Sequence, residues 1–172
     1  MALTIPPGVD AQGRRQAIFV PTNSLSVALL TGATSVDITC YLTKGTFGTS
    51  AETERGTDER ECSVDAYEVL GKTTWTLNDL EYVWEPQAAS ASPTNKAYDT
   101  LKLGTQGFIV VRFGLQDLDA APLAAAQKVW QFPVTLGAQV PKTPEGGAAE
   151  KLKIVQPVVV TGPVVQDAVL VV

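Results

Sequence analysis

Three acidic side chains between residues 79 and 85 come closest to a catalytic pattern in this sequence: Asp79, Glu81 and Glu85. Paired carboxylates catalyse glycoside hydrolysis when one acts as the acid and the other as base or nucleophile. Glu81 and Glu85 lie on one face of an expected strand, two pleats apart, with no third polar residue to separate their pKa values. We therefore expect no catalysis here. No loop has the ligand spacing of a calcium site either.

Histidine is absent from the 172 residues, which removes the commonest general base, nucleophile activator and metal ligand. Carboxylate-only, lysine-based or cofactor-based chemistry stays open in principle. The two cysteines are too few for a structural zinc site or a disulfide scaffold. We expect a protein that is not an enzyme and uses no cofactor or metal.

The cysteines, Cys40 and Cys62, lie in phase with the apolar faces of two expected strands. One interpretation places them at matching positions of a hairpin, close enough for a bridge. The alternative, which we favour, is two buried small residues that stay reduced during assembly in a cytoplasm.

Aromatic residues also admit two interpretations. Trp75, Trp84, Trp130 and Tyr82 would suit a sugar platform or a surface for stacking single-stranded bases. All of them are in phase with aliphatic residues, which favours packing in the core or between subunits.

Composition indicates a globular chain, with 45% hydrophobic and 18% charged residues. The net charge of −5 argues against ordinary nucleic-acid binding, which needs basic side chains to neutralise phosphates. The N-terminus has no secretory signal pattern, and the apolar C-terminal stretch is too interrupted to span a membrane. These features predict a soluble protein.

Hydrophobic periodicity predicts a mainly β fold, a sandwich or barrel with one flanking α-helix. Residues 1–21 are rich in Pro, Gly and polar groups and are expected to form an N-terminal arm, with residues 22–172 as one domain. Residues 93–103 are the expected helix, and a short helix within 22–31 is a weaker candidate. Strands are expected at 73–85, 108–113, 128–136, 152–160 and 164–171, and Pro133 favours a ladder position without a donor, such as a sheet edge.

Two more strands, 36–42 and 62–67, are expected to form a hairpin around a long polar loop at about residues 44–61. Loops of this length in compact domains are usually functional or disordered. Residues 44–68 hold seven acids and three bases, most of the net charge of the chain.

Several sequence blocks, in order, resemble the major tail proteins (tail tube proteins) of long-tailed, siphovirus-type phages that infect actinobacteria. The blocks are residues 40–43, 76–87, 97–102, 107–114, 130–137 and 160–167. The resemblance implies a virion protein that forms rings of six, stacked into a tube that conducts double-stranded DNA. It also implies an inner β-barrel shared by the subunits, with the hairpin loop and terminal arm linking adjacent rings. Tape-measure, tail-tip and tail terminator proteins are the partners that it implies, without any membrane.

The implied dimensions are compatible with DNA. Six subunits that each supply four strands give about 24 strands, and about 4.8 Å spacing with about 40° tilt gives a diameter near 48 Å. A bore of roughly 38 Å remains after side chains are subtracted, wider than a duplex of about 20 Å.

The resemblance assigns two sets of candidate residues. Asp37, Thr39, Ser63 and Asp65 are candidates for a lumen wall that repels phosphate. The candidates for contacts between rings are Glu52, Glu54, Arg55, Asp58, Glu59 and Arg60. The alternative for both sets is a solvated loop. The aliphatic closing strands would be an adhesive edge unless subunits bury them. Other functions left open are a tube subunit of a phage-derived particle and a monomeric carbohydrate-binding β-sandwich module.

Overall fold

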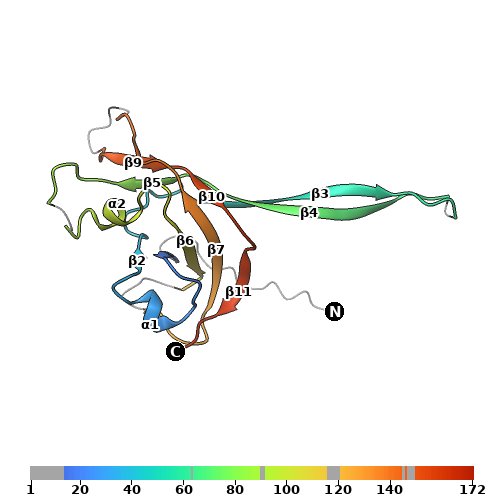
Figure 1. Cartoon of the computed structure of the whole chain (residues 1–172), viewed down its shortest axis with the longest axis horizontal. Helices are drawn as coiled ribbons and strands as arrows, with labels where there is room; N and C mark the ends of the chain where they lie inside the picture. Colours follow the sequence, from blue (N-terminus) through green and yellow to red (C-terminus); the bar gives the residue numbers. More distant parts are fainter. Residues whose placement is uncertain (1–13, 63, 90–91, 116–120, 145, 147–149) are drawn as a thin grey trace, which may run out of the picture.

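A computed structural model describes residues 14–172 except 63, 90–91, 116–120, 145 and 147–149. It is mainly β, as predicted, and consists of a curved body from which one long ribbon projects (Figure 1). The strands are β1 (Arg15–Val20), β2 (Val36–Asp37), β3 (Thr49–Asp58), β4 (Tyr67–Leu77), β5 (Leu80–Val83), β6 (Gln106–Phe113), β7 (Lys128–Leu136), β8 (Val140–Pro141), β9 (Lys153–Gln156), β10 (Val158–Val160) and β11 (Val165–Val169). The helices are α1 (Val27–Leu30) and α2 (Lys96–Thr100).

The body is organised around β6, which pairs with β1 on one side and β7 on the other. Its apolar run is covered on both faces, as the sequence predicts. Ile109 and Val111 enter the larger core cluster, and Val110 enters a smaller cluster on the opposite face. Because side chains alternate along a strand, β1 divides in the same way, with Phe19 in the larger cluster and Ile18 in the smaller one.

Gly107 allows β1 and β6 to approach closely. A Cβ atom at this position would lie 2.6 Å from both Phe19 Cζ and the carbonyl oxygen of Val20. Only glycine fits here, since the backbone oxygen belongs to a fully paired strand.

Both closing strands, β10 and β11, pair with β7 in succession along its outer side. Pro133 lies where the chain passes from one to the other: its carbonyl accepts a hydrogen bond from the N–H of Thr161 at 2.9 Å. The expected ladder position without a donor is confirmed, but it is not at a sheet edge, since β7 has partners on both sides. The missing N–H of Pro133 faces the break between β10 and β11, so no ladder bond is lost.

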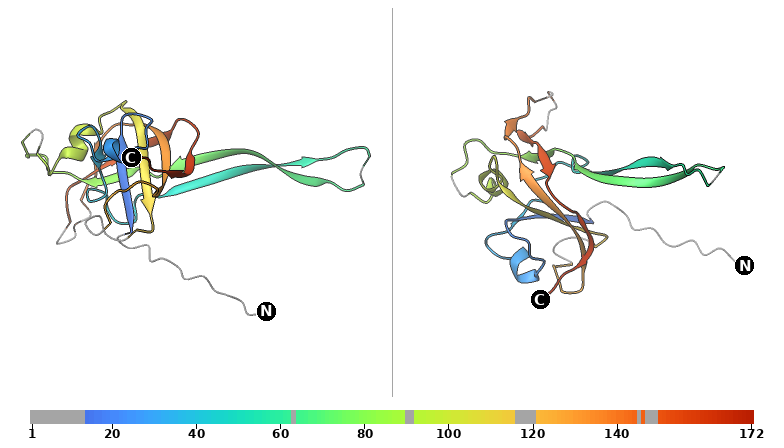
Figure 2. Two further views of the ribbon diagram at one scale, coloured as in Figure 1. Left: turned by 90° about the horizontal axis from the view of Figure 1, so that it is seen from below. Right: turned by 45° about the vertical axis from the view of Figure 1, so that its right-hand side comes forward.

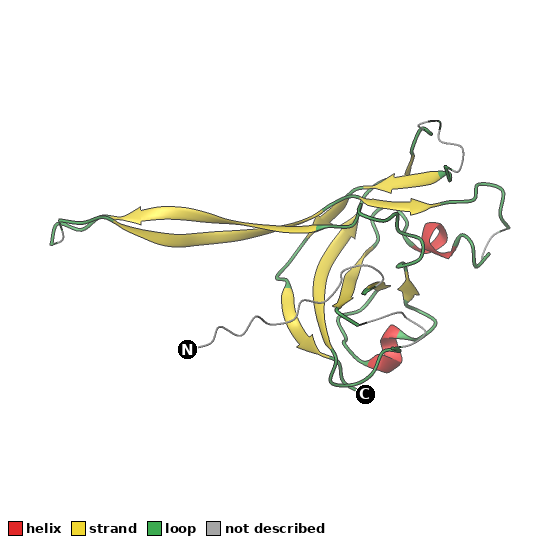
Figure 3. Ribbon diagram, turned by 180° about the vertical axis from the view of Figure 1, so that it is seen from behind, coloured by secondary structure: helices red, strands yellow, loops and turns green. Residues whose placement is uncertain are grey.

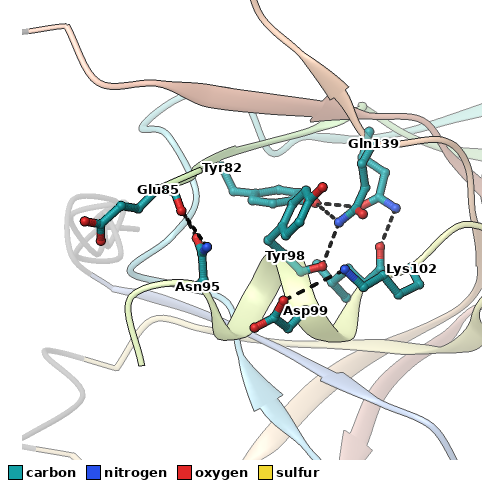
Figure 4. Close-up of polar contacts among 9 residues, drawn as sticks. Tyr82, Glu85, Asn95, Tyr98, Asp99, Lys102 and Gln139 are labelled. Atoms are coloured by element: carbon teal, nitrogen blue, oxygen red, sulfur yellow. Dashed lines mark hydrogen bonds and ion pairs between the residues drawn. The ribbon is translucent and has the colours of Figure 1, made fainter. Parts of the chain in front are cut away.

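A smaller sheet of β5, β9 and β8 forms a second layer together with α2. The polar side chains at its centre are hydrogen-bonded to one another (Figure 4). The Tyr82 hydroxyl donates to Gln156 Oε1 at 3.1 Å and accepts from Gln139 Nε2 at 2.8 Å. Burial raises the pKa of Tyr82 to about 12, so the hydroxyl stays protonated.

The helices are shorter than expected. α2 occupies only residues 96–100 of the predicted 93–103. Asn95, at its N-cap, makes no capping bond, because its side chain accepts from the N–H of Glu85 at 3.0 Å and donates to the carbonyl of Glu85 at 2.7 Å. α1 occupies residues 27–30 of the candidate range 22–31 and is capped by Ser26, whose Oγ accepts from the N–H of Leu29 at 3.2 Å.

Two boundaries drawn from the sequence are wrong. Residues 15–20 are not part of an arm, because β1 is a buried strand of the main sheet; the rest of the expected arm, residues 1–13, lies outside the described residues. The predicted hairpin of 36–42 with 62–67 does not exist either. β2 pairs with β1, and the expected polar loop is mostly the strand β3, which pairs with β4.

Candidate assembly interface

β3 and β4 form a two-stranded ribbon, here called the arm (residues 49–77), that extends far beyond the body (Figures 1 and 2). The ten residues of β3 span roughly 34 Å at strand spacing. Almost all residues of both strands are exposed, and no third strand pairs with either of them among the described residues. An isolated ribbon is marginally stable in water, so this geometry suits a segment that binds a partner.

A β-bulge divides the arm into two halves. Between the pairs Thr53↔Thr73 and Arg55↔Leu70, one residue of β3 faces two residues of β4. The odd-numbered residues of β4 therefore change face at the bulge: Tyr67 and Val69 lie on the face opposite to Trp75.

The distal half combines exposed apolar and charged side chains. On one face, Tyr67 and Val69 are exposed opposite Asp58 and Gly56, where the glycine adds no side chain. Leu70 is 77% exposed on the other face. Apolar side chains so far from any core indicate a contact surface.

All six candidates for contacts between rings lie on the arm. Glu52, Glu54, Arg55 and Asp58 are in β3, and Glu59 and Arg60 are in the turn that follows it. Arg60 pairs with Asp58 at 2.9 Å and Arg55 with Glu68 at 3.6 Å. Exposed pairs of this kind add little stability. The arm therefore brings these residues together, and their role between rings stays a prediction.

The arm is attached to the body by an aromatic cluster. Trp75 meets Trp130 edge to face with ring centroids 5.8 Å apart and meets Phe132 at 6.3 Å. Trp130 also contacts Phe113 at 6.1 Å. Next to this cluster, a groove of about 560 Å³ runs between residues 72–75 of β4 and residues 160–164. Trp75 and Trp130 pack against the larger core cluster, as the sequence analysis favoured over a sugar platform.

The lumen candidates are not brought together. Asp37 and Thr39 lie at the outer edge of β1, where Asp37 Oδ2 accepts from Gln16 Nε2 at 2.7 Å and Thr39 Oγ1 accepts from the N–H of Ala17 at 2.9 Å. The Thr39 hydroxyl thus occupies a backbone donor of β1 that an added strand would use. Asp65 is at the arm tip, and Ser63 lies outside the described residues. Their exposure to a lumen stays a prediction.

The cysteines differ from both expectations. Cys40 lies in the body and Cys62 in the turn at the arm tip, and both are exposed free thiols. They are not buried, since neither belongs to a core-facing strand. The length of the arm separates them, far beyond the reach of a disulfide within one chain.

The carboxylates of residues 79–85 do not face each other as a pair. Glu81 accepts hydrogen bonds from Lys153 Nζ at 2.8 Å and from Lys142 Nζ at 3.1 Å. These bonds lower the pKa of the Glu81 carboxyl group, and the bond from Lys153 has the larger effect. This cluster ties β5 to β9 and to the residue after β8. The part of the chain that the structure describes has no group of three metal-ligating side chains and no helix that could cross a membrane.

The sheet edge formed by β10 and β11 exposes aliphatic side chains, as the sequence predicts. Val159, Val165 and Val169 are 62%, 44% and 53% exposed. The edge is interrupted by a bulge between Val165 and Ala168, where Asp167 has a φ of 50°. Bulges on an edge discourage indiscriminate pairing with other chains.

A β body that carries a long uncovered ribbon is the architecture of a subunit that assembles with others. The chain belongs to the phage tail tube protein family, because the family model with that description matches residues 3–172. It is a structural component of a phage tail, which favours the tail-tube interpretation over the carbohydrate-binding module.

The fold is also similar to a chain in a solved structure, described as the cryo-EM structure of the anti-feeding prophage (AFP) baseplate, 6-fold symmetrised. The TM-score is 0.55 at 14% identity, over 95% of this chain and 98% of the other. At this identity the likeness shows the fold alone. No curated protein matches the sequence.

Proposed function

We propose that this chain forms the wall of a phage tail tube by self-assembling into stacked rings of six, and that the bore conducts double-stranded DNA. The arm is the observation that carries this proposal. All ten residues of β3 and ten of the eleven residues of β4 are exposed or half-exposed. No third strand pairs with this ribbon among the described residues, so it needs a partner surface, as roughly three strands are the minimum for a stable free sheet. In a stack of rings, neighbouring copies provide that surface.

The charge distribution supports passage of DNA without binding. The chain carries 13 basic and 18 acidic residues, and an acidic or hydroxyl-lined wall repels phosphate within a Debye length of about 8–10 Å. In this proposal Asp37, Thr39, Ser63 and Asp65 are the lumen candidates. The arm residues from Glu52 to Arg60 contact the next ring.

The biological setting follows from the sequence resemblance. The tube belongs to a siphovirus-type phage of an actinobacterial host and assembles in the host cytoplasm. Tape-measure, tail-tip and tail terminator proteins set the length and the ends of the tube.

A second candidate is the tube of a phage-derived particle that delivers no genome. The observation in favour of this second candidate is the similarity in fold to a chain of a prophage baseplate. Genes for a terminase, a portal and a capsid next to this gene would support the DNA-conducting tail, and their absence would support the second candidate.

Negative-stain electron microscopy of the full chain at high concentration, alone and with its tail-tip partners, tests the proposal. We expect rings or tubes with a central hole. Monomers under every condition would contradict it, and so would a channel wall crowded with lysine and arginine in a solved assembly.

A further inference from the structure

The arm and one surface of the body lie at opposite ends of the molecule. β4 ends at Leu77 and β5 begins at Leu80, so the chain returning from the arm tip continues across the body to the far side (Figures 1 and 3). There β5, β9 and α2 lie together, away from the arm in every view. We call this the far-end surface and define it by Trp84, Tyr98, Leu103, Val140, Leu152 and their neighbouring lysines.

The far-end surface is apolar and incompletely covered. Leu103, Val140 and Leu152 are 70%, 53% and 45% exposed. The rings of Trp84 and Tyr98 pack against each other with centroids 5.4 Å apart. The backbone N–H of Trp84 donates to the carbonyl of Leu152 at 2.9 Å, which places Leu152 beside this pair. Exposed aliphatic groups around an aromatic pair form the kind of surface that receives apolar side chains of a partner.

The charged side chains of the two ends allow ion pairs between copies. Residues 58–68 of the arm contain five acids and one base. The far-end surface carries five lysines: Lys96, Lys102, Lys142, Lys151 and Lys153. Among the described residues the nearby acids number four, Glu81, Glu85, Asp99 and Glu150, and the sequence of the same segment adds Glu145, so lysines and acids balance at this end. Among the described residues, Lys96 and Lys151 are in no ion pair.

We propose that the far-end surface is the receptor for the arm tip of a second copy of this chain. Tyr67 and Val69 contact its apolar side chains, and Glu59 and Glu61 lie near Lys96 and Lys151. A projection at one end and its receptor at the other make a heterologous contact, which repeats head to tail instead of closing a dimer. The contact therefore adds copies along one axis, as stacking of rings requires. This inference rests on the proposed function and names the surface that stacking uses.

Photo-cross-linking of the full chain tests the contact directly. A benzophenone amino acid replaces Tyr67, and the matched control carries it at Val159 on the exposed sheet edge. After assembly and irradiation, we expect the benzophenone at position 67 to cross-link to peptides of residues 96–103 or 140–153 of another copy. The Val159 control should yield no cross-link to these peptides.

A charge exchange provides the second readout. Lys151→Glu should reduce the amount of tube several-fold at low salt, and Glu61→Lys in the same chain should restore it, since the pair then has opposite signs again. Lys128→Glu, a matched change on β7, should leave tube formation unaltered.

The outcomes separate this inference from the proposed function. Tubes in which Tyr67 cross-links to β10, β11 or another arm would overturn the inference alone. Failure of Glu61→Lys to restore the Lys151→Glu variant would also count against it. If the unmodified chain forms neither rings nor tubes and the variant with benzophenone at position 67 shows no cross-link between copies, both are overturned.

Discussion

The ring of Trp75 meets the ring of Trp130 edge to face at 5.8 Å, and this contact joins the arm to the main sheet. Trp75→Ala should lower the free energy of unfolding by about 2–4 kcal/mol, because it removes a half-buried indole from an aromatic cluster. Trypsin should also cleave the arm faster, after Arg55, Arg60 or Lys72. Urea titration and limited proteolysis measure the two effects.

Trp84→Ala is the matched control, since Trp84 packs against Tyr98 at 5.4 Å on the far side of the body. It should lower stability while leaving cleavage within the arm unchanged. Equal acceleration of arm cleavage in both variants would contradict the role of Trp75 as the attachment.

Gly107→Ala should destabilise the body by about 1–3 kcal/mol or more, because the new methyl group overlaps the Val20 carbonyl oxygen of a paired strand. Chemical denaturation measures the loss. Gly56→Ala on the arm is the control: its Cβ would lie 3.5 Å from Val69 Cγ2, an ordinary contact, and the change should stay within about 0.5 kcal/mol. Equal effects at the two glycines would refute the packing described for β1 and β6.

Glu81→Gln should reduce stability at neutral pH, because the Lys153 and Lys142 ammonium groups lose their carboxylate partner. The pKa of Glu81 is lowered in the folded state, so its contribution is fully present above the ordinary carboxyl pKa of about 4.3 and is lost as the pH falls through the folded value. Denaturation at pH 7 and at acidic pH tests this.

The difference between wild type and Glu81→Gln should be largest at neutral pH and shrink below about pH 4. Glu52→Gln, at an exposed arm position, should show no such trend. A difference that grows on acidification would have the wrong sign for this account.

Both thiols should react with a disulfide reagent in the native protein, because Cys40 and Cys62 are exposed and unbonded. An Ellman assay without denaturant should release two equivalents of thiolate per chain, and Cys62→Ser should remove one of them. Thiols that react only after denaturation would disprove the exposure of both.

Sequence patterns predicted the body much better than the arm. β6 was identified by the apolar run from Phe108 to Phe113, and β7 by the alternation of Trp130, Phe132 and Val134. Both strands face the core, so their apolar pattern follows directly from burial. β1 was missed although Ala17 to Val20 is a continuous apolar run, because its polar and Pro-rich neighbours resembled an arm. That run was the signal that could have found it.

The arm could not be found from periodicity. β3 has no aliphatic residue larger than alanine, so alternation of apolar and polar residues is absent. Its strand form comes from backbone pairing with β4, where Thr73 and Thr74 face Thr53 and Glu52, and not from burial. The bulge that turns Tyr67 and Val69 to a new face depends on the pairing of two distant segments, which one strand alone does not specify.

Shortening the arm tests the central claim most directly. Glu52 and Thr74 face each other, so an Asn-Gly turn can replace residues 53–73 without disturbing Trp75 or the body. Electron microscopy should show rings or tubes with a central hole for the full chain, whereas the shortened chain, folded by circular dichroism, should form no tubes. Tubes of equal length and order without the arm would contradict the account.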